Sequence, residues 1–233
     1  TDTFEIGMKS EWLDNRLLLN ATLFYMKWKD YQQSSSNLGG QWWLRGTFNA
    51  ADAEQKGIEL ETTYLFTENL EVSLTGYWAD PEWSDTYWFP YQDPETDEPG
   101  IVKGALMPNS PEYKGRASLW WSIPGLFGTE DVFLYYDISF EGKRYNNIDN
   151  ARDEGDLGKM PSWNISNLQI GANFHNEWSI NLVVRNLFDQ KAIMWLDTGS
   201  NYISDWFGAD WNRDIRTYNR PRSISVQFRK NWD

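Results

Sequence analysis

The chain has 233 residues, no cysteine and a formal net charge of −13 at pH 7. This acidity argues against nucleic acid as a partner, because phosphate binding needs clustered lysine and arginine. The lack of cysteine excludes disulfides and thiolate metal sites. Aromatic residues make up 17% of the chain and include 15 tryptophans, which is far above ordinary globular usage and predicts a role for aromatic side chains in bulk.

The hydropathy of the chain excludes a membrane-spanning helix but not a membrane barrel. Mean hydropathy is −0.67, and no apolar run approaches the roughly eighteen residues that a membrane helix needs. Barrel strands are only about ten residues long, and only alternate residues face lipid. Mean hydropathy over a window of consecutive residues therefore does not detect them. The segment Thr1–Phe4 lacks the basic start and apolar core of a signal peptide. If the chain belongs to a membrane protein, we therefore expect its gene product to begin upstream of Thr1.

The first part of the chain predicts four strands, because apolar and polar residues alternate with a period of two. Tight turns at Asp14–Arg16 and Thr67–Leu70 close two hairpins, whereas long polar connections separate the hairpins from each other and from the second part of the chain. The longest of these connections, Asp80–Pro108, is acidic and aromatic. In chain order the predicted strands are Phe4–Trp12, Leu17–Tyr31, Gly57–Tyr64 and Leu70–Trp78.

The second part predicts five more strands with the same alternation. Pro124–Glu130 and His175–Trp178 are tight turns, and Gly142–Lys159 and the segment after Asp189 are long loops. In the last strand Ile224, Val226 and Phe228 alternate with polar residues. The predicted strands are Glu112–Ile123, Val132–Glu141, Leu168–Phe174, Ser179–Arg185 and Ser223–Trp232.

The regular succession of short and long connections predicts an all-β, antiparallel up-and-down transmembrane barrel. Such barrels have short periplasmic turns, long external loops, a polar lumen and aromatic girdles at both interfaces. The alternative is a soluble, tryptophan-rich β-sandwich that binds carbohydrate, whose strands also have one apolar and one polar face. The tryptophans near strand ends, where girdle residues belong, are Trp12, Trp28, Trp78, Trp121, Trp163 and Trp178. The residues of the shared polar face are Glu59, Glu61, Lys114, Arg116, Asp137 and Arg185.

Five motifs succeed one another along nearly the whole chain. They are a hairpin of the form E-x-G-x-K-S…D-x-R-L-x-L-N over Glu5–Asp30, N-A-x-x-A…G-x-E-x-E over Asn49–Glu61, P-N-x-P over Pro108–Pro111, N-L-F-D over Asn186–Asp189, and R-P-R opening the last strand at Arg220–Arg222. In this order the motifs resemble the closing part of a TonB-dependent outer-membrane receptor.

The resemblance implies a barrel of about twenty-two strands around a plug domain. Residues 1–233 would form its C-terminal part, about nine strands, because nine strands with two unpaired edges cannot stand alone in lipid. The plug, the earlier strands and the segment that contacts the TonB complex would lie upstream. The family motif residues expected to have structural roles are Asn186, Leu187, Phe188, Arg222, Phe228 and Trp232. One departure is that Asp233 follows Trp232, where the family usually ends on an aromatic residue.

The resemblance also implies a function and a location. The chain would belong to an active transporter of the Gram-negative outer membrane, with membrane lipid, the TonB complex and a small nutrient as partners. Aromatic residues of the long loops are the candidate ligand contacts, because flat rings stack on sugars or aromatic chelators: Trp83, Trp88, Tyr91, Trp195, Trp206 and Trp211. Neighbouring carboxylates favour neutral or cationic ligands. An iron-siderophore and a saccharide both remain candidates, as does packing of these aromatics against one another.

Catalysis and resident cofactors are not predicted. The loop carboxylates Asp93, Glu95 and Asp97 have no partner histidine, so solvated surface charge is the simpler interpretation. His175, the single histidine, lies in a turn. The segment Asp149–Asp156 lacks the oxygen ligands of an EF-hand at Ala151 and Arg152. No specific metal site is predicted, although the acidic loops leave a looser divalent-cation site open.

Overall fold

The computed structural model describes residues 1–35, 46–89, 92–146, 158–175, 177–197 and 215–231. The regular elements among these residues are β-strands, apart from one 3₁₀ turn, η1 (Leu126–Gly128), which lies between two strands. In the described part of the chain, no helix is both long and apolar enough to cross a membrane.

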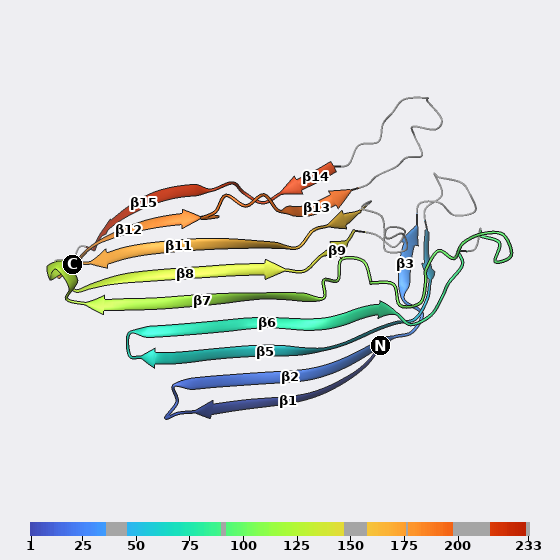
Figure 1. Cartoon of the computed structure of the whole chain (residues 1–233), viewed down its shortest axis with the longest axis horizontal. Helices are drawn as coiled ribbons and strands as arrows, with labels where there is room; N and C mark the ends of the chain where they lie inside the picture. Colours follow the sequence, from blue (N-terminus) through green and yellow to red (C-terminus); the bar gives the residue numbers. More distant parts are fainter. Residues whose placement is uncertain (36–45, 90–91, 147–157, 176, 198–214, 232–233) are drawn as a thin grey trace.

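A single antiparallel sheet of nine strands contains most of the described residues (Figure 1). Its order is β1-β2-β5-β6-β7-β8-β11-β12-β15, so each strand pairs with the next long strand along the chain. The up-and-down arrangement and the nine predicted strands are therefore confirmed. The bounds are β1 Asp2–Trp12, β2 Leu17–Trp28, β5 Ala53–Thr67, β6 Leu70–Trp83, β7 Tyr113–Pro124, β8 Asp131–Glu141, β11 Trp163–Asn173, β12 Trp178–Arg185 and β15 Ser223–Lys230.

The connections sort by length onto the two ends of the sheet, as predicted. All four tight turns lie at the end where β15 also finishes, and the long connections lie at the other end (Figure 1). The turn between β1 and β2 has three consecutive residues with positive φ, Leu13, Asp14 and Asn15. Local turn chemistry of this kind favours Asn and Asp, which tolerate the left-handed region. The turn end is called the periplasmic end below and the loop end the external end.

The strand register gives the sheet two faces. Paired residues point to the same side of a sheet, so the pairs Ile6↔Leu23, Leu23↔Ile58 and Ile58↔Trp78 carry one apolar face across four strands. The same row continues onto β7 through Trp78↔Tyr113. The opposite face carries the predicted polar residues, as the pairs Glu61↔Thr75 and Thr75↔Arg116 show.

Two glycines let strands and rings approach closely. A Cβ on Gly57 would lie 2.4 Å from the Trp78 carbonyl oxygen and 2.7 Å from the Phe24 ring. A Cβ on Gly115 would lie 2.7 Å from the Thr75 carbonyl oxygen and 2.8 Å from the Phe140 ring. In each case a phenylalanine from the neighbouring strand covers the bare backbone, an arrangement that helps to fix strand register.

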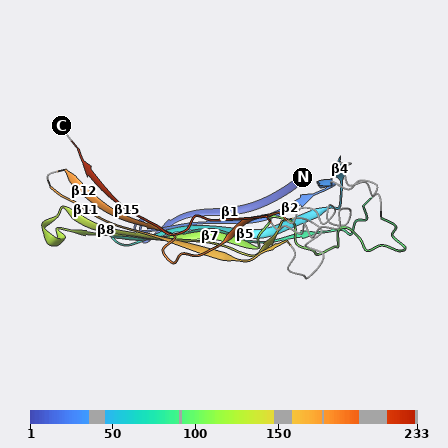
Figure 2. The same cartoon turned by 90° about the horizontal axis from the view of Figure 1, so that it is seen from above.

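The sheet is curved and open. Seen from above, it forms a shallow trough rather than two stacked layers (Figure 2). Strands β1 and β15 stand at its two edges. Large apolar side chains on one face are widely exposed, among them Ile6 at 72%, Leu23 at 55% and Phe228 at 70%. An exposed apolar face of this extent marks a surface that is covered in the assembled protein.

The long connections are more ordered than the sequence predicts. Strands β5 and β6 continue past the predicted ends, and their last pair is Ala53↔Trp83, so the expected loop begins after Trp83 rather than at Asp80. β11 begins at Trp163, five residues before the predicted strand. Three small hairpins were not predicted: β3 Gln32–Ser35 with β4 Gly46–Asn49, β9 Arg144–Tyr145 with β10 Lys159–Met160, and β13 Ile193–Asp197 with β14 Ile215–Tyr218.

Candidate functional site

The polar face of the sheet forms a broad groove of about 890 Å³ across β1 to β11. Its chemistry is mixed, because acidic side chains stand on β5 and basic ones on β7. This is the face that a closed barrel would turn toward its lumen, and it is called the lumenal face below. The groove is lined by Lys9, Asn20, Thr22, Glu59, Glu61, Thr75, Tyr77, Lys114, Arg116, Ser139 and Trp163, together with Leu60, Gly76, Gly115 and Phe140.

Ion pairs join β7 to β8 on the lumenal face. Arg116 Nη2 lies 3.2 Å from Asp137 Oδ1, and the Asp137 side chain is only 5% exposed. Asp137 also accepts a hydrogen bond of 3.0 Å from Asn167 Nδ2, and Arg116 donates one of 2.9 Å to the Tyr135 hydroxyl. This network leaves the buried carboxylate compensated from two neighbouring strands, as a buried charge requires.

A second ion-pair group lies nearer the external end. Lys114 Nζ is 3.2 Å from Glu141 Oε2, and Arg144, just beyond β8, also pairs with Glu141. Arg144 Nη2 donates a hydrogen bond of 2.7 Å to the Met194 carbonyl on β13. Burial lowers the pKa of the Arg144 guanidinium, with a smaller opposing effect from Tyr77. Arg144 therefore ties the barrel wall to the last long loop.

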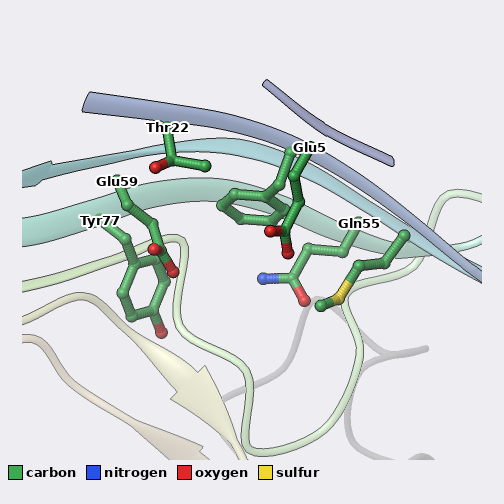
Figure 3. Close-up of a pocket in the computed structure, with 7 residues that line it drawn as sticks. Glu5, Thr22, Gln55, Glu59 and Tyr77 are labelled. Carbon is green, nitrogen blue, oxygen red and sulfur yellow. The ribbon is translucent and has the colours of Figure 1, made fainter. Parts of the chain in front are cut away.

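A hollow of about 130 Å³ lies on the lumenal face of β1, β2, β5 and β6. The side chains of Glu5, Gln55, Glu59 and Tyr77 extend from the strands toward the same side (Figure 3). Within the described residues, neither Glu5 nor Glu59 has an ion-pair partner. In contrast to β7 and β8, this part of the wall carries uncompensated negative charge.

An apolar cluster closes the external end of β5 and β6. Trp83 is 1% exposed and its ring packs edge-on against Tyr31, with 5.3 Å between the centroids. The buried members of the cluster are Ala50, Ala51, Ala53, Trp83, Phe89, Ile101 and Met107, and Trp28, Tyr31, Phe48, Tyr87 and Ala105 pack against it. The long connections thus have a core of their own.

The candidate ligand-contacting aromatics fall into four groups. Trp83 lies inside the loop core, and its burial fits the alternative that loop aromatics pack against one another. Trp88 is half-buried, and its indole nitrogen is covered without a hydrogen-bond partner in the described structure. Trp195 on β13 is 51% exposed and offers a free ring face. Tyr91, Trp206 and Trp211 lie outside the described residues. A ligand role for this set remains a prediction.

The N-L-F-D and R-P-R motifs meet in space. The buried Asn186 has a positive φ of 52° and donates from Nδ2 to the carbonyls of Gln190 and Arg220, at 2.9 and 3.0 Å. Asp189 Oδ1 accepts a hydrogen bond of 2.8 Å from the Arg222 backbone nitrogen. Leu187 donates its backbone N–H to the Ser166 carbonyl at 2.7 Å. These residues fix the path between β12 and β15.

The other motif residues face outward or are not described. Phe188 is 69% exposed and Phe228 is 70% exposed, and Phe228 lies on the apolar face because it pairs with Ile180. Trp232 is outside the described residues. Among the described residues, no group of three or more histidine, aspartate or glutamate side chains is placed to hold a metal ion.

The family model described as "TonB dependent receptor-like, beta-barrel" matches residues 1–187. The chain therefore belongs to the TonB-dependent receptor family, whose members are receptors and transporters rather than enzymes. No curated protein matches the chain in sequence.

Several solved structures of receptors have the same fold. The ferric yersiniabactin uptake receptor FyuA from Yersinia pestis is 19% identical, with a TM-score of 0.71 over 99% of this chain and 30% of the receptor. The siderophore receptor PiuA from Acinetobacter baumannii is 18% identical, with a TM-score of 0.67 over 97% of this chain and 27% of the receptor. The ferric citrate transporter FecA is 17% identical, with a TM-score of 0.64 over 97% of this chain and 30% of the transporter. The chain thus spans less than a third of each of these proteins, and the likeness shows the fold.

Proposed function

We propose that residues 1–233 form the C-terminal part of the barrel of an outer-membrane receptor that imports a scarce nutrient with energy from the TonB complex. The observation that carries the proposal is the nine-stranded sheet with one apolar and one polar face, in a chain of this family. Outer-membrane lipid covers the apolar face, and the earlier strands pair with the edges of β1 and β15 to close the barrel.

The soluble β-sandwich is not favoured. A sandwich buries one face of each sheet against the other, whereas all nine long strands here belong to one sheet whose apolar face is exposed. The buried apolar cluster of the described residues lies among the long connections at the external end.

The lumenal face supports a plug domain inside the barrel. Glu5 and Glu59 point into the lumen without an ion-pair partner among the described residues, and an enclosed carboxylate needs a cationic partner or a neutral form. We propose that basic side chains of a plug domain, which lies upstream in the full-length protein, neutralise them.

For the ligand, we propose a ferric chelate. The similar solved structures include receptors for ferric yersiniabactin and ferric citrate. A saccharide is the competitor, because the exposed ring of Trp195 suits stacking on either class. The acidic character of the chain favours chelates that carry no net negative charge.

Deletion of the gene tests the transport function and separates the two ligand classes. We expect slower growth under iron limitation, no defect on glycans, and the same iron defect in a strain without TonB. A growth defect confined to a glycan would replace the chelate with a saccharide. Normal growth under both conditions, with normal uptake of radioactive iron, would argue against both ligands.

The contribution of Trp195 is tested at the level of affinity. Loss of an aromatic stacking contact is worth about 0.5–1.5 kcal/mol, so Trp195→Ala should weaken ligand binding by about two- to tenfold. The matched control is Phe127→Ala, which removes a ring that is 90% exposed at the opposite end of the sheet. Equal effects of the two substitutions on affinity would remove Trp195 from the binding site.

A further inference from the structure

Strand β13 at the external end presents one large ring to solvent. In the described part of the chain it pairs with β14 alone. The register between the two strands shifts between Ile193 and Trp195, so that Met194 is an extra residue of β13. An extra residue in one strand of a pair re-aims the side chains beside it. Trp195 follows this shift and is 51% exposed, whereas its neighbour Leu196 is only 2% exposed.

Two side chains from the connection between β8 and β11 hold β13 by its backbone. Arg144 Nη2 donates a hydrogen bond of 2.7 Å to the Met194 carbonyl, and Asn146 Nδ2 donates one of 2.6 Å to the Leu196 carbonyl. Met194 and Leu196 are the residues on either side of Trp195. Because the backbone is held at both of these carbonyls, the direction in which the Trp195 ring projects is restricted.

The P-N-x-P motif holds the donor segment in turn. The Asn109 backbone N–H donates to the Tyr145 carbonyl at 2.7 Å, and Asn109 Nδ2 donates to the Asn146 carbonyl at 3.2 Å. Asn109 has a positive φ of 57°, a conformation that asparagine tolerates better than most residues do. Asn109, Arg144 and Asn146 are together called the loop clasp below. The clasp joins the β6–β7, β8–β11 and β12–β15 connections.

The clasp does for β13 what apolar packing does not. Leu196 is buried, but apolar burial is non-directional and does not by itself set the angle of a neighbouring ring. Hydrogen bonds have preferred angles, and the two to β13 end on the residues that flank Trp195. None of the described members of the apolar cluster at the external end belongs to β13. The clasp therefore fixes the orientation of β13.

We infer that Asn109, Arg144 and Asn146 are positioning residues for Trp195, which they hold in the orientation that stacks on a flat apolar or aromatic surface of the ligand. This inference rests on the proposed function, because it takes Trp195 as a ligand contact. A ring that is already oriented binds more tightly, since less ordering is required on binding. Loss of the clasp should therefore weaken capture of the ligand and leave the later steps of transport unchanged.

Asn146→Asp in the full-length receptor opens the clasp at one hydrogen bond. The carboxylate has the size of the amide but has no N–H to donate to the Leu196 carbonyl. The matched control is Gln92→Glu, because Gln92 Nε2 donates a hydrogen bond of 2.9 Å to the Glu98 carbonyl within the β6–β7 connection. Both substitutions remove an amide donor and add a negative charge at the external end, but only Asn146→Asp acts on β13.

The concentration dependence of iron uptake tests whether the clasp acts through Trp195. The probe is radioactive iron added to spent medium of the iron-starved parent strain, offered to cells in a dilution series. Asn146→Asp should raise the half-saturating concentration by about two- to tenfold, as the loss of a stacking contact would, with the maximal rate unchanged. Gln92→Glu should change neither. In a Trp195→Ala background, Asn146→Asp should cause no further loss, because the two residues are coupled.

Two results of the uptake assay would overturn the inference and leave the transport function intact. One is an equal loss from Asn146→Asp with and without the Trp195 ring. The other is a lower maximal rate at an unchanged half-saturating concentration, which would give Asn146 a merely structural role. Heat-modifiable migration on gels confirms that each barrel is folded.

Fluorine NMR tests the orientation of the ring without a ligand. A single 5-fluorotryptophan is placed at position 195 of the full-length receptor in nanodiscs. Asn146→Asp should shift or split its signal, and Gln92→Glu should leave the signal in place. An unchanged signal in Asn146→Asp would overturn the positioning role. Iron uptake that does not depend on the receptor gene would instead contradict the ferric-chelate proposal, and the fluorine signal alone would then decide whether the clasp orients the ring.

Discussion

The two faces of the sheet are made by the same strands and yet meet opposite solvents. Trp120 and Trp121 are neighbours in β7, but Trp120 pairs with Tyr135 on the lumenal face, whereas Trp121 pairs with Leu134 on the apolar face. Trp120 stacks on Phe133 with 4.9 Å between the ring centroids. Trp121 is 45% exposed. Trp120 itself is 39% exposed, so a step of one residue changes the face on which a ring lies rather than how much of the ring is exposed, and the alternation itself encodes the two faces.

The assignment of the two faces is tested most strongly by placing a charge on each face in turn. Leu74 faces outward, midway between Leu70 and Trp78, and its neighbour Ser73 faces the lumen. Leu74→Arg should destabilise the full-length barrel by about 2–4 kcal/mol, because arginine near the bilayer midplane is costly. Ser73→Arg should cost far less. Reversible denaturant unfolding in liposomes measures both, and equal costs would contradict the assignment of the faces.

The ion pairs of the two faces should also differ in strength. Asp137→Asn keeps the shape of the side chain but leaves Arg116 without its buried carboxylate partner, so we expect a loss of about 1–3 kcal/mol. The matched control is Asp80→Asn. Its partner Lys56 lies at 3.3 Å with side chains 55% and 40% exposed, so the loss should stay below about 1 kcal/mol. The same unfolding assay applies, and a larger loss for Asp80→Asn would reverse the assignment.

The sheet could be predicted from the sequence because its signals are local. Alternation over eight to twelve residues and tight turns such as Asp14–Arg16 fix the strands, their order and the end at which each turn lies. The same alternation placed Glu59, Arg116 and Asp137 on one face. Which of those charges pair depends on register between strands, so the Arg116–Asp137 ion pair was not predicted.

The external end could not be predicted because it depends on contacts between distant segments. The sequence predicts a loop at Trp83, but the alternation of buried Ala79, Pro81 and Trp83 with Asp80 and Glu82 continues strand β6. Pro81 made a strand less expected at this position, since proline usually argues against a strand interior. The hydrogen bond from Arg144 to the Met194 carbonyl joins residues fifty positions apart, and no local sequence pattern predicts it.

The smallest expected effect is spectroscopic and separates the two neighbouring tryptophans directly. Bromine atoms on lipid acyl chains quench only those indoles that touch the hydrocarbon. Trp121→Phe should therefore reduce the lipid-quenchable part of the fluorescence by about the share of one interfacial tryptophan, because its ring lies at the lipid boundary where such girdle residues belong. Trp120→Phe should leave the quenchable part unchanged, since its ring is stacked on Phe133 inside the barrel.

The full-length receptor is compared in brominated and unbrominated liposomes of the same thickness. If Trp120→Phe lowered the quenchable part and Trp121→Phe did not, the apolar face would be the lumenal one, and the assignment of lipid and lumen would have to be exchanged.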